Sequence, residues 1–332
     1  MPGHERFVLC APRRCGFNDV LNQIWVAHLL AVREDRRLII DTRVAGLGDD
    51  LDHYLTPQPS MGITASLTDE ALARLNVMTC YPRIWHRRID FIHRETQVRN
   101  AGASRPRRAS RAVAYALDGV RLANEPPFTG GLSRRLAFAV TAPPRLLRSA
   151  PARNRPEDLV VTHSSGGGPH GADALGLFTY TPAVRSAVAA AQGMLGPDYD
   201  ALHIRPTDLP TNYKPLLHEA VRTPAGRRVL VCSDDPAVVE EARATLTDSD
   251  VATVTTVEDT AGTGLHKSTA HRSLAEKRTI NTAMLVDLMA LAGSSRLFVA
   301  PTRDGGFSGF SFLAKSLHRR RPLVAALMGQ SP

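Results

Sequence analysis

The sequence contains few lysines and few aromatic residues. Only Lys214, Lys267, Lys277 and Lys315 stand among 41 basic residues, so arginine carries most of the positive charge behind the formal net charge of +9. Such a balance favours phosphorylated or otherwise anionic partners. Aromatic residues make up 5% of the chain and provide few platforms for stacked bases. A nucleic-acid binder is therefore a weaker alternative than a protein that binds a small anionic ligand.

Cysteine is also scarce, and long apolar runs are lacking. The four cysteines form no C-x-x-C pair and have no histidine cluster beside them, so neither a zinc site nor a disulfide framework is indicated. No apolar run of signal-peptide length precedes Arg13, and no segment approaches ~18 uninterrupted apolar residues. We therefore expect a cytoplasmic protein with reduced thiols and no membrane span.

The N-terminal stretch has the pattern of a parallel α/β unit. The length of 332 residues is about twice the ~150 expected of one domain, so we expect two domains. Apolar spacing predicts a strand at 7–9, a helix at 21–32 and a strand at 38–40. The loop 15–19 between the first strand and the helix could receive an anion or a sugar hydroxyl through its backbone N–H groups. Alternatively, Asn18 or Asp19 only caps the helix.

The middle of the chain is rich in arginine, proline and glycine. Segments 100–112 and 142–157 are expected to be basic surface loops. Segment 163–173 is rich in glycine but lacks the lysine of a P-loop, so we expect a flexible loop near the domain junction. A proline-initiated helix at 181–195 follows it.

The chemistry concentrates where a buried strand at 199–204 ends. His203, Arg205, Thr207 and Asp208 come at this point, before Pro210. In an open parallel sheet, ligands bind at the carboxyl ends of the strands. The guanidinium of Arg205 is permanently charged and suits bidentate contact with phosphate. In the alternative interpretation, Arg205 and Asp208 form a salt bridge and His203 is a hydrogen-bonded core residue.

Two further strands end in polar clusters. The predicted strand 228–232 is followed by Asp234 and Asp235 before a helix at 237–245, where the two carboxylates either accept hydrogen bonds from a nucleoside or cap the helix. The predicted strand 297–300 ends in the Gly/Ser turn 301–311 before a helix at 312–318, an arrangement typical of anion sites. A strand at 251–257 and a helix at 279–291 are also expected, and this helix carries one lone carboxylate, Asp287, which needs a partner.

Several of these motifs, taken in order, resemble the fucosyltransferase superfamily of GT-B glycosyltransferases. They are C-G-F-N-D-x-L from residue 15, R-L-I-I-D-T-R from 37, H-I-R-P-T-D from 203, C-S-D-D-P from 232, G-L-H-K from 264, M-L-V-D-L from 284 and F-V-A-P-T-R-D-G-G-F-S-G-F-S from 298. The chain is most similar to bacterial nodulation fucosyltransferases and α-1,6-fucosyltransferases. The match is more specific over about 198–318 than in the first 40 residues.

The resemblance implies an α/β fold with two Rossmann-like domains facing a cleft. Residues 1–190 would form the acceptor-side domain and residues 191–332 the domain that binds the nucleotide sugar. It also implies inverting, metal-independent transfer from a GDP-sugar, most plausibly GDP-fucose, to a hydroxyl of an oligosaccharide or a small glycosylated metabolite. No other cofactor is expected. No D-x-D motif stands at a strand end to bind a metal with the diphosphate.

The resemblance also assigns roles to single residues. Arg205 falls on the arginine that neutralises the departing β-phosphate, where fixed positive charge lowers the barrier. The other expected site residues are His203 and Asp208 shaping the donor pocket, Asp234 and Asp235 on the base or ribose, Asp287 ordering that pocket, Arg303 in the donor site, Ser308 and Ser311 on phosphate oxygens, and Asn18 in the acceptor cleft.

Two departures from the family pattern bear on mechanism. Pro206 replaces the second arginine that many relatives have, and the region 211–214 lacks the glutamate that some relatives use as general base. Three options follow for deprotonating the acceptor: Asp208 is the base, the N-terminal domain supplies one, or the reaction needs little base assistance. A GT-B module that binds a nucleotide or glycan without turnover is the alternative function.

Overall fold

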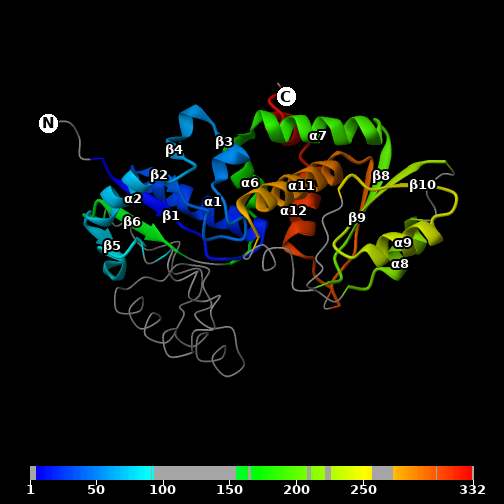
Figure 1. The fold of residues 1–332 in the computed structure, drawn as a ribbon, viewed down its shortest axis with the longest axis horizontal. Helices are drawn as coiled ribbons and strands as arrows, with labels where there is room; N and C mark the ends of the chain where they lie inside the picture. The colour runs from blue at the N-terminus through cyan, green and yellow to red at the C-terminus, as the bar shows by residue number, and fades with distance from the viewer. Residues whose placement is uncertain are drawn as a thin grey trace.

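The computed structural model describes residues 5–90, 92, 155–163, 166–207, 211–220, 226–255, 272–303 and 305–330. Several sequence expectations lie outside these residues, namely those for Asp208, 100–112, 256–257, 264–267 and most of 142–157. Two parallel sheets lie toward opposite ends of the molecule, with α1, α11 and α12 between them (Figure 1). Among the helices of the described residues, none combines the length and apolar character needed to cross a membrane.

The N-terminal sheet is built around the first strand. Among the described residues its five strands are, in order across the sheet, β4 (Ile63–Thr64), β2 (Arg37–Ile40), β1 (Phe7–Cys10), β6 (Leu159–Thr162) and β5 (Cys80–Tyr81). All the pairings are parallel, and Phe7 is in register with both Arg37 and Leu159. The four residues of β1 are buried, as expected of a central parallel strand covered on both faces. The predicted parallel α/β start, which includes helix α1 (Phe17–Glu34), is confirmed.

The C-terminal sheet carries the predicted strand-end clusters. Among the described residues its four strands are, in order, β10 (Asp250–Ala252), β9 (Arg228–Ser233), β8 (Tyr199–Ile204) and β11 (Arg296–Val299). Every pairing is parallel, so the carboxyl ends of β8, β9 and β11 lie at one edge of the sheet. All six residues of β8 are buried. Helices α8 (Lys214–Ala220) and α9 (Pro236–Thr245) lie together at this end of the molecule (Figure 1).

Further helices and a small sheet complete the described structure. An antiparallel pair joins β3 (Leu55–Pro57) to β7 (Phe178–Tyr180). The remaining elements are α2 (Asp69–Asn76), α6 (Gly171–Leu175), α7 (Pro182–Leu195), α11 (Leu274–Gly293), α12 (Gly309–His318), α13 (Arg321–Leu327) and three short 3-10 segments at Leu51–His53, Pro59–Met61 and Arg83–Trp85. Helix α12 packs against both α1 and α11, and one hydrophobic core includes residues of all three helices.

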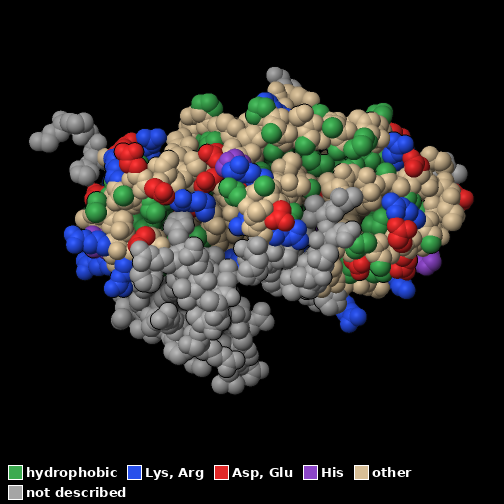
Figure 2. Space-filling view, viewed as in Figure 1, with side chains coloured by type: hydrophobic (Ala, Val, Ile, Leu, Met, Phe, Trp, Pro, Cys, Tyr) green, Lys and Arg blue, Asp and Glu red, His purple; other side chains and the backbone are tan. Residues whose placement is uncertain are grey.

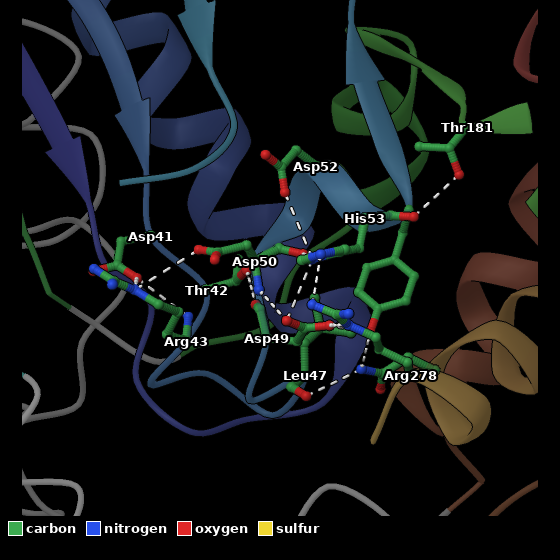
Figure 3. Close-up of polar contacts among 12 residues, drawn as sticks. Asp41, Thr42, Arg43, Leu47, Asp49, Asp50, Asp52, His53, Thr181 and Arg278 are labelled. Carbon is green, nitrogen blue, oxygen red and sulfur yellow. Dashed lines mark hydrogen bonds and ion pairs between the residues drawn. The ribbon is translucent and has the colours of Figure 1, made fainter. Parts of the chain in front are cut away.

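A polar network fixes the loop after β2 to helix α11 (Figure 3). Asp49, which is buried, accepts hydrogen bonds from the hydroxyl of Tyr54 at 2.8 Å and from Nε of Arg278 at 3.0 Å. Arg278 also contacts the His53 ring, with Nη2 2.6 Å from Nε2. Asn281, one helical turn further along α11, donates to the Tyr54 hydroxyl at 2.9 Å. The two ends of the molecule are therefore joined by specific hydrogen bonds in addition to the shared core.

Helix starts differ from the predicted ones for identifiable reasons. Helix α1 begins at residue 17 rather than 21, and its N-cap is Gly16 rather than Asn18 or Asp19. Helix α11 begins at 274 rather than 279 because Ser273 and Glu276 form a capping box. Helix α12 begins at 309 rather than 312 because Ser308 accepts a hydrogen bond from the backbone N–H of Ser311. Residues 171–173, expected to lie in a loop, instead begin α6.

Charge is unevenly distributed along the chain. The stretch 91–154 contains twelve arginines and three acidic residues, so it alone has a formal charge of +9 and the rest of the chain is neutral. Basic and acidic side chains are interspersed over the visible face of the described structure (Figure 2). The long-range field of the described residues therefore does not select an anion, and selection must come from local geometry.

Candidate functional site

The end of β8 presents a neutral histidine that connects the sheet to α12. His203 is buried, and its Nδ1 lies 2.8 Å from the hydroxyl oxygen of Ser311. Burial, assisted by the nearby Arg205 guanidinium, lowers the pKa of His203 to about 3. The ring is therefore uncharged near neutral pH and ties α12 to the strand that carries Arg205. The Phe310 ring also packs against His203, with the two ring centroids 5.1 Å apart.

Arg205 lies beside a carboxylate from the neighbouring strand end. Its Nε is 3.7 Å from Oδ2 of Asp234, which directly follows β9. The Thr207 hydroxyl donates a hydrogen bond to the same carboxylate oxygen. Asp234 thus holds residues from the β8 end in place.

The N-terminus of α12 stands next to this pair of strand ends. Ser308 and Ser311 are buried, and their hydroxyl oxygens lie 2.8 Å apart. Because Ser308 caps the backbone N–H of Ser311, the first-turn N–H groups of Gly309 and Phe310 are the ones without an intrahelical acceptor. The helix dipole adds partial positive charge at the same point. A diphosphate would find hydrogen-bond donors and positive potential here.

A second helix N-terminus, that of α1, meets the first. A Cβ at Gly309 would lie 3.4 Å from Cβ of Asn18 and 3.7 Å from Oδ1 of Asp19. Asn18 is 5% exposed, and its Oδ1 has no hydrogen-bond partner in the described part of the chain. The site therefore has two helix N-termini facing each other. The unpaired Asn18 oxygen points away from them, toward Gly171 of α6, where an added Cβ would overlap it.

The glycine-rich loop closes against α1. Gln23 donates to the carbonyl of Gly166 at 2.8 Å, and Asn18 donates to the carbonyl of Gly168 at 3.3 Å. A Cβ at Gly167 would lie 2.7 Å from Oδ1 of Asp19, so glycine is required for this close approach. The described part of the predicted flexible loop is thus attached to α1 by side-chain hydrogen bonds.

Asp19 is a site residue that the sequence interpretation treated only as a possible cap. Burial raises its pKa above the usual range, while a hydrogen bond with the Gly16 backbone and the charge of Arg205 oppose the shift. Arg205 is thus close enough to affect a carboxyl group from the other end of the molecule. The only signal in the sequence was a carboxylate in a strand-to-helix loop, which a simple N-cap explains equally well.

The structure places the remaining predicted residues as follows. Asp235 caps α9, accepting from the backbone N–H of Ala237 at 2.9 Å, which is the structural role considered for it. Asp287 is bonded to the hydroxyl of Thr255 at 2.8 Å, and burial raises its pKa to about 7. Arg303 is exposed in the turn after β11.

Comparison with known proteins gives a structural match but no sequence match. No protein-family model matches the chain, and no curated protein matches it. Among solved structures, fucosyltransferase NodZ from Bradyrhizobium superposes with a TM-score of 0.56 at 16% identity, over 94% of this chain and 93% of that one. The chain has the GT-B fucosyltransferase fold. The predicted fold class is therefore confirmed.

Two of the matching structures come from crystals that were treated with a nucleotide or a nucleotide sugar. A NodZ α-1,6-fucosyltransferase crystal soaked with GDP-fucose has a TM-score of 0.57 at 18% identity, covering 94% of this chain and 92% of that chain. A NodZ crystal grown with GDP has a TM-score of 0.55 at 16% identity, with the same coverage of both chains. At these identities the match establishes the fold, and the chemistry must be argued from the site itself.

Proposed function

We propose that the chain is a glycosyltransferase that moves fucose from GDP-fucose to a hydroxyl acceptor. The observation that carries this proposal is the convergence of Arg205 with the N-termini of α1 and α12 at the carboxyl edge of the C-terminal sheet. Negative charge develops on the departing diphosphate as the glycosidic bond breaks, and preorganised positive charge at that place lowers the barrier. NodZ structures of the same fold were obtained with GDP-fucose and GDP, which supports this choice of donor.

Each part of the site has a role in this proposal. Arg205 neutralises the β-phosphate, and the N–H groups of Gly309 and Phe310 bind phosphate oxygens. Ser308 and Ser311 set the geometry of that helix turn, and His203 anchors it to β8. Asp234 orients Arg205. Asp234 and Asp235 are also the residues proposed to bind the guanine base or the ribose of the donor. The positive groups replace a metal, so transfer is proposed to be metal-independent. It inverts the anomeric carbon if the acceptor attacks opposite the departing diphosphate, as this proposal holds.

The N-terminal half is proposed to bind the acceptor. Asn18 is proposed to contact a sugar hydroxyl of the acceptor through its amide Nδ2, which lies 3.5 Å from where a Cβ at Gly309 of α12 would stand. An oligosaccharide or a small glycosylated metabolite has hydroxyls of this kind. In this proposal residues 1–190 form the acceptor side and residues 191–332 the donor side of a cytoplasmic enzyme. Asp208, Asp287 and Arg303 keep their proposed donor-side roles.

Calorimetry and GDP release test the proposal. The full chain should bind GDP and GDP-fucose without added metal, in preference to UDP and ADP, and should release GDP from GDP-fucose. Arg205→Ala should lower release by about 100-fold or more while leaving the unfolding midpoint unchanged. Arg243→Ala, which changes an exposed arginine on α9, is the matched control. Retained turnover in Arg205→Ala would contradict the mechanism, and nucleotide binding without turnover would identify a binding module instead.

A further inference from the structure

The described site contains a carboxylate that has no role in the proposed binding of the donor. Asp19 lies in the first turn of α1, with its Oδ1 against Gly167 and 3.7 Å from where a Cβ at Gly309 would stand. Its side chain is only partly buried, so a proton can pass between it and solvent. It makes no ion pair in the described part of the chain, so it is not neutralised by direct contact. Its neighbour Asn18 presents its amide Nδ2, rather than its oxygen, to the same Gly309.

We propose that Asp19 is the catalytic base that deprotonates the acceptor hydroxyl. This inference rests on the proposed glycosyl transfer. It identifies the general base, for which the sequence analysis left three options. The acceptor oxygen forms the new bond to the anomeric carbon while the bond from that carbon to the diphosphate oxygen breaks. The diphosphate leaves with the electron pair next to Arg205, and the acceptor proton moves to the Asp19 carboxylate and then to solvent. Glycoside, GDP and one proton are the products.

The position of Asp19 suits a base for a reaction across two domains. Arg205 belongs to the C-terminal sheet and Asp19 to the N-terminal helix, so a donor bound at Arg205 would face an acceptor held at Asp19. The contacts of α1 with Gly166 and Gly168 keep the helix N-terminus in place against the loop. Because a Cβ at Gly167 would come within 2.7 Å of Oδ1, the loop itself also fixes the direction of the carboxylate. Asp208, the other candidate, lies outside the described residues.

Electrostatics agree with a proton-accepting role. Burial raises the pKa of Asp19, and a carboxylate with a raised pKa is a stronger base once ionised. Among the described residues, the titratable groups that interact with it are the Arg205 guanidinium, which directly follows β8, and the Cys15 thiol from the preceding loop, whose own pKa is raised by burial and by Asp19. The glycines of the loop 166–168 and Gly309 of α12 add no titratable side chain.

Asp19→Asn tests this role without changing the shape of the side chain. The assay measures GDP released from GDP-fucose, with water or a mixture of oligosaccharides as acceptor, between about pH 5 and pH 9. We expect unchanged GDP affinity by calorimetry, a release rate lower by about 100-fold or more, and loss of the acid limb of the pH profile. Asp69→Asn, at a carboxylate with 98% side-chain exposure on α2, should match the unmodified chain in all three.

The outcomes separate this inference from the proposed function. Since burial disfavours the ionised form of Asp19, the asparagine variant should be at least as stable as the unmodified chain, and its unfolding midpoint verifies this. An unchanged rate and pH profile would overturn the role of Asp19. Lost GDP affinity in Asp19→Asn alone would overturn it too, by placing Asp19 in the donor site. Failure of the unmodified chain to bind GDP or to release it would overturn the proposed function, and the base with it.

Discussion

At the scale of single residues, the buried polar groups of the site couple stability to pH. His203 is held neutral in the folded chain, with a pKa of about 3 against 6.5 ordinarily. The pKa of Asp287 is shifted in the opposite direction, because burial raises it to about 7. His203 thus contributes stability above pH 6.5, whereas Asp287 contributes it at low pH and loses it as pH rises toward 7. Both residues lie on elements that support the carboxyl edge of the C-terminal sheet.

We predict that acid destabilises the protein partly through His203. Below pH 6.5 the unfolded chain takes up a proton at this residue, but the folded chain does not until about pH 3. The stability that His203 contributes is therefore lost as pH falls through this window, by about 1 to 2 kcal/mol at pH 5, while protonation of Asp287 in the folded chain acts in the opposite sense. His203→Asn, which keeps a hydrogen-bonding atom near the Nδ1 position, should lose less stability. Urea unfolding at pH 7 and pH 5 measures the change in unfolding free energy for the unmodified chain and for the variant. The same change in both proteins would contradict this account.

A second prediction concerns the close approach of α6 to α1. A Cβ at Gly171 would overlap Oδ1 of Asn18 and lie 3.2 Å from Cδ1 of Leu313. Gly171→Ala should therefore destabilise the chain by about 1–3 kcal/mol, as overpacking does. Gly193 in α7 is the matched control, because a Cβ there meets nothing within 4 Å, and Gly193→Ala should stabilise the helix by about 1 kcal/mol. Thermal unfolding compares them, and equal midpoints would rule out the predicted clash.

At the scale of elements, α11 is attached to the N-terminal half through Asp49. Replacing Asp49 by Ala would remove the acceptor for the Tyr54 hydroxyl and for Nε of Arg278. Because the Tyr54 hydroxyl is buried, we expect a loss of about 1–3 kcal/mol in unfolding free energy. Asp52→Ala removes a neighbouring carboxylate with 48% side-chain exposure and should have little effect. Chemical denaturation of both variants measures the difference, and similar losses would show that the network does not stabilise the chain.

Most elements could be predicted from the sequence, but their starts could not. The run 199–204 and the prolines at the starts of α7 and α9 marked a strand and two helices correctly. The starts of α11 and α12 were placed too late, because the prediction followed the apolar pattern, whereas Ser273 and Ser308 cap the helices before that pattern begins. Strand β6 was missed, since its three apolar residues and Thr162 follow an arginine-rich segment and show their role only when paired with β1.

At the scale of the whole molecule, the sequence predicted which strand ends carry the site, but not which parts of the chain pack together there. The ends of β8 and β9 could be placed at one edge because parallel strands share a direction. That the N-terminus of α1 would meet α12 depends on how the two ends of the molecule pack, which no local pattern specifies. Asp19 was therefore read as a possible cap, although the structure places it against the turn of Gly309. Tertiary packing, rather than residue type, distinguishes a catalytic candidate from a helix cap here.

The hydrophobic core shared by the two halves leads to a last prediction. GDP should stabilise the N-terminal half, although the main contacts of GDP are proposed at Arg205. Both tryptophans, Trp25 and Trp85, lie in the N-terminal half, and the core joins α1 to α11 and α12. Tryptophan fluorescence and far-UV circular dichroism should therefore report one unfolding transition. GDP at a hundredfold excess over its Kd should raise the free energy of unfolding of the protein by about 2.7 kcal/mol, as measured by either signal. Arg205→Ala should abolish the shift in both. A tryptophan transition that occurs earlier and does not respond to GDP would show that the halves unfold independently.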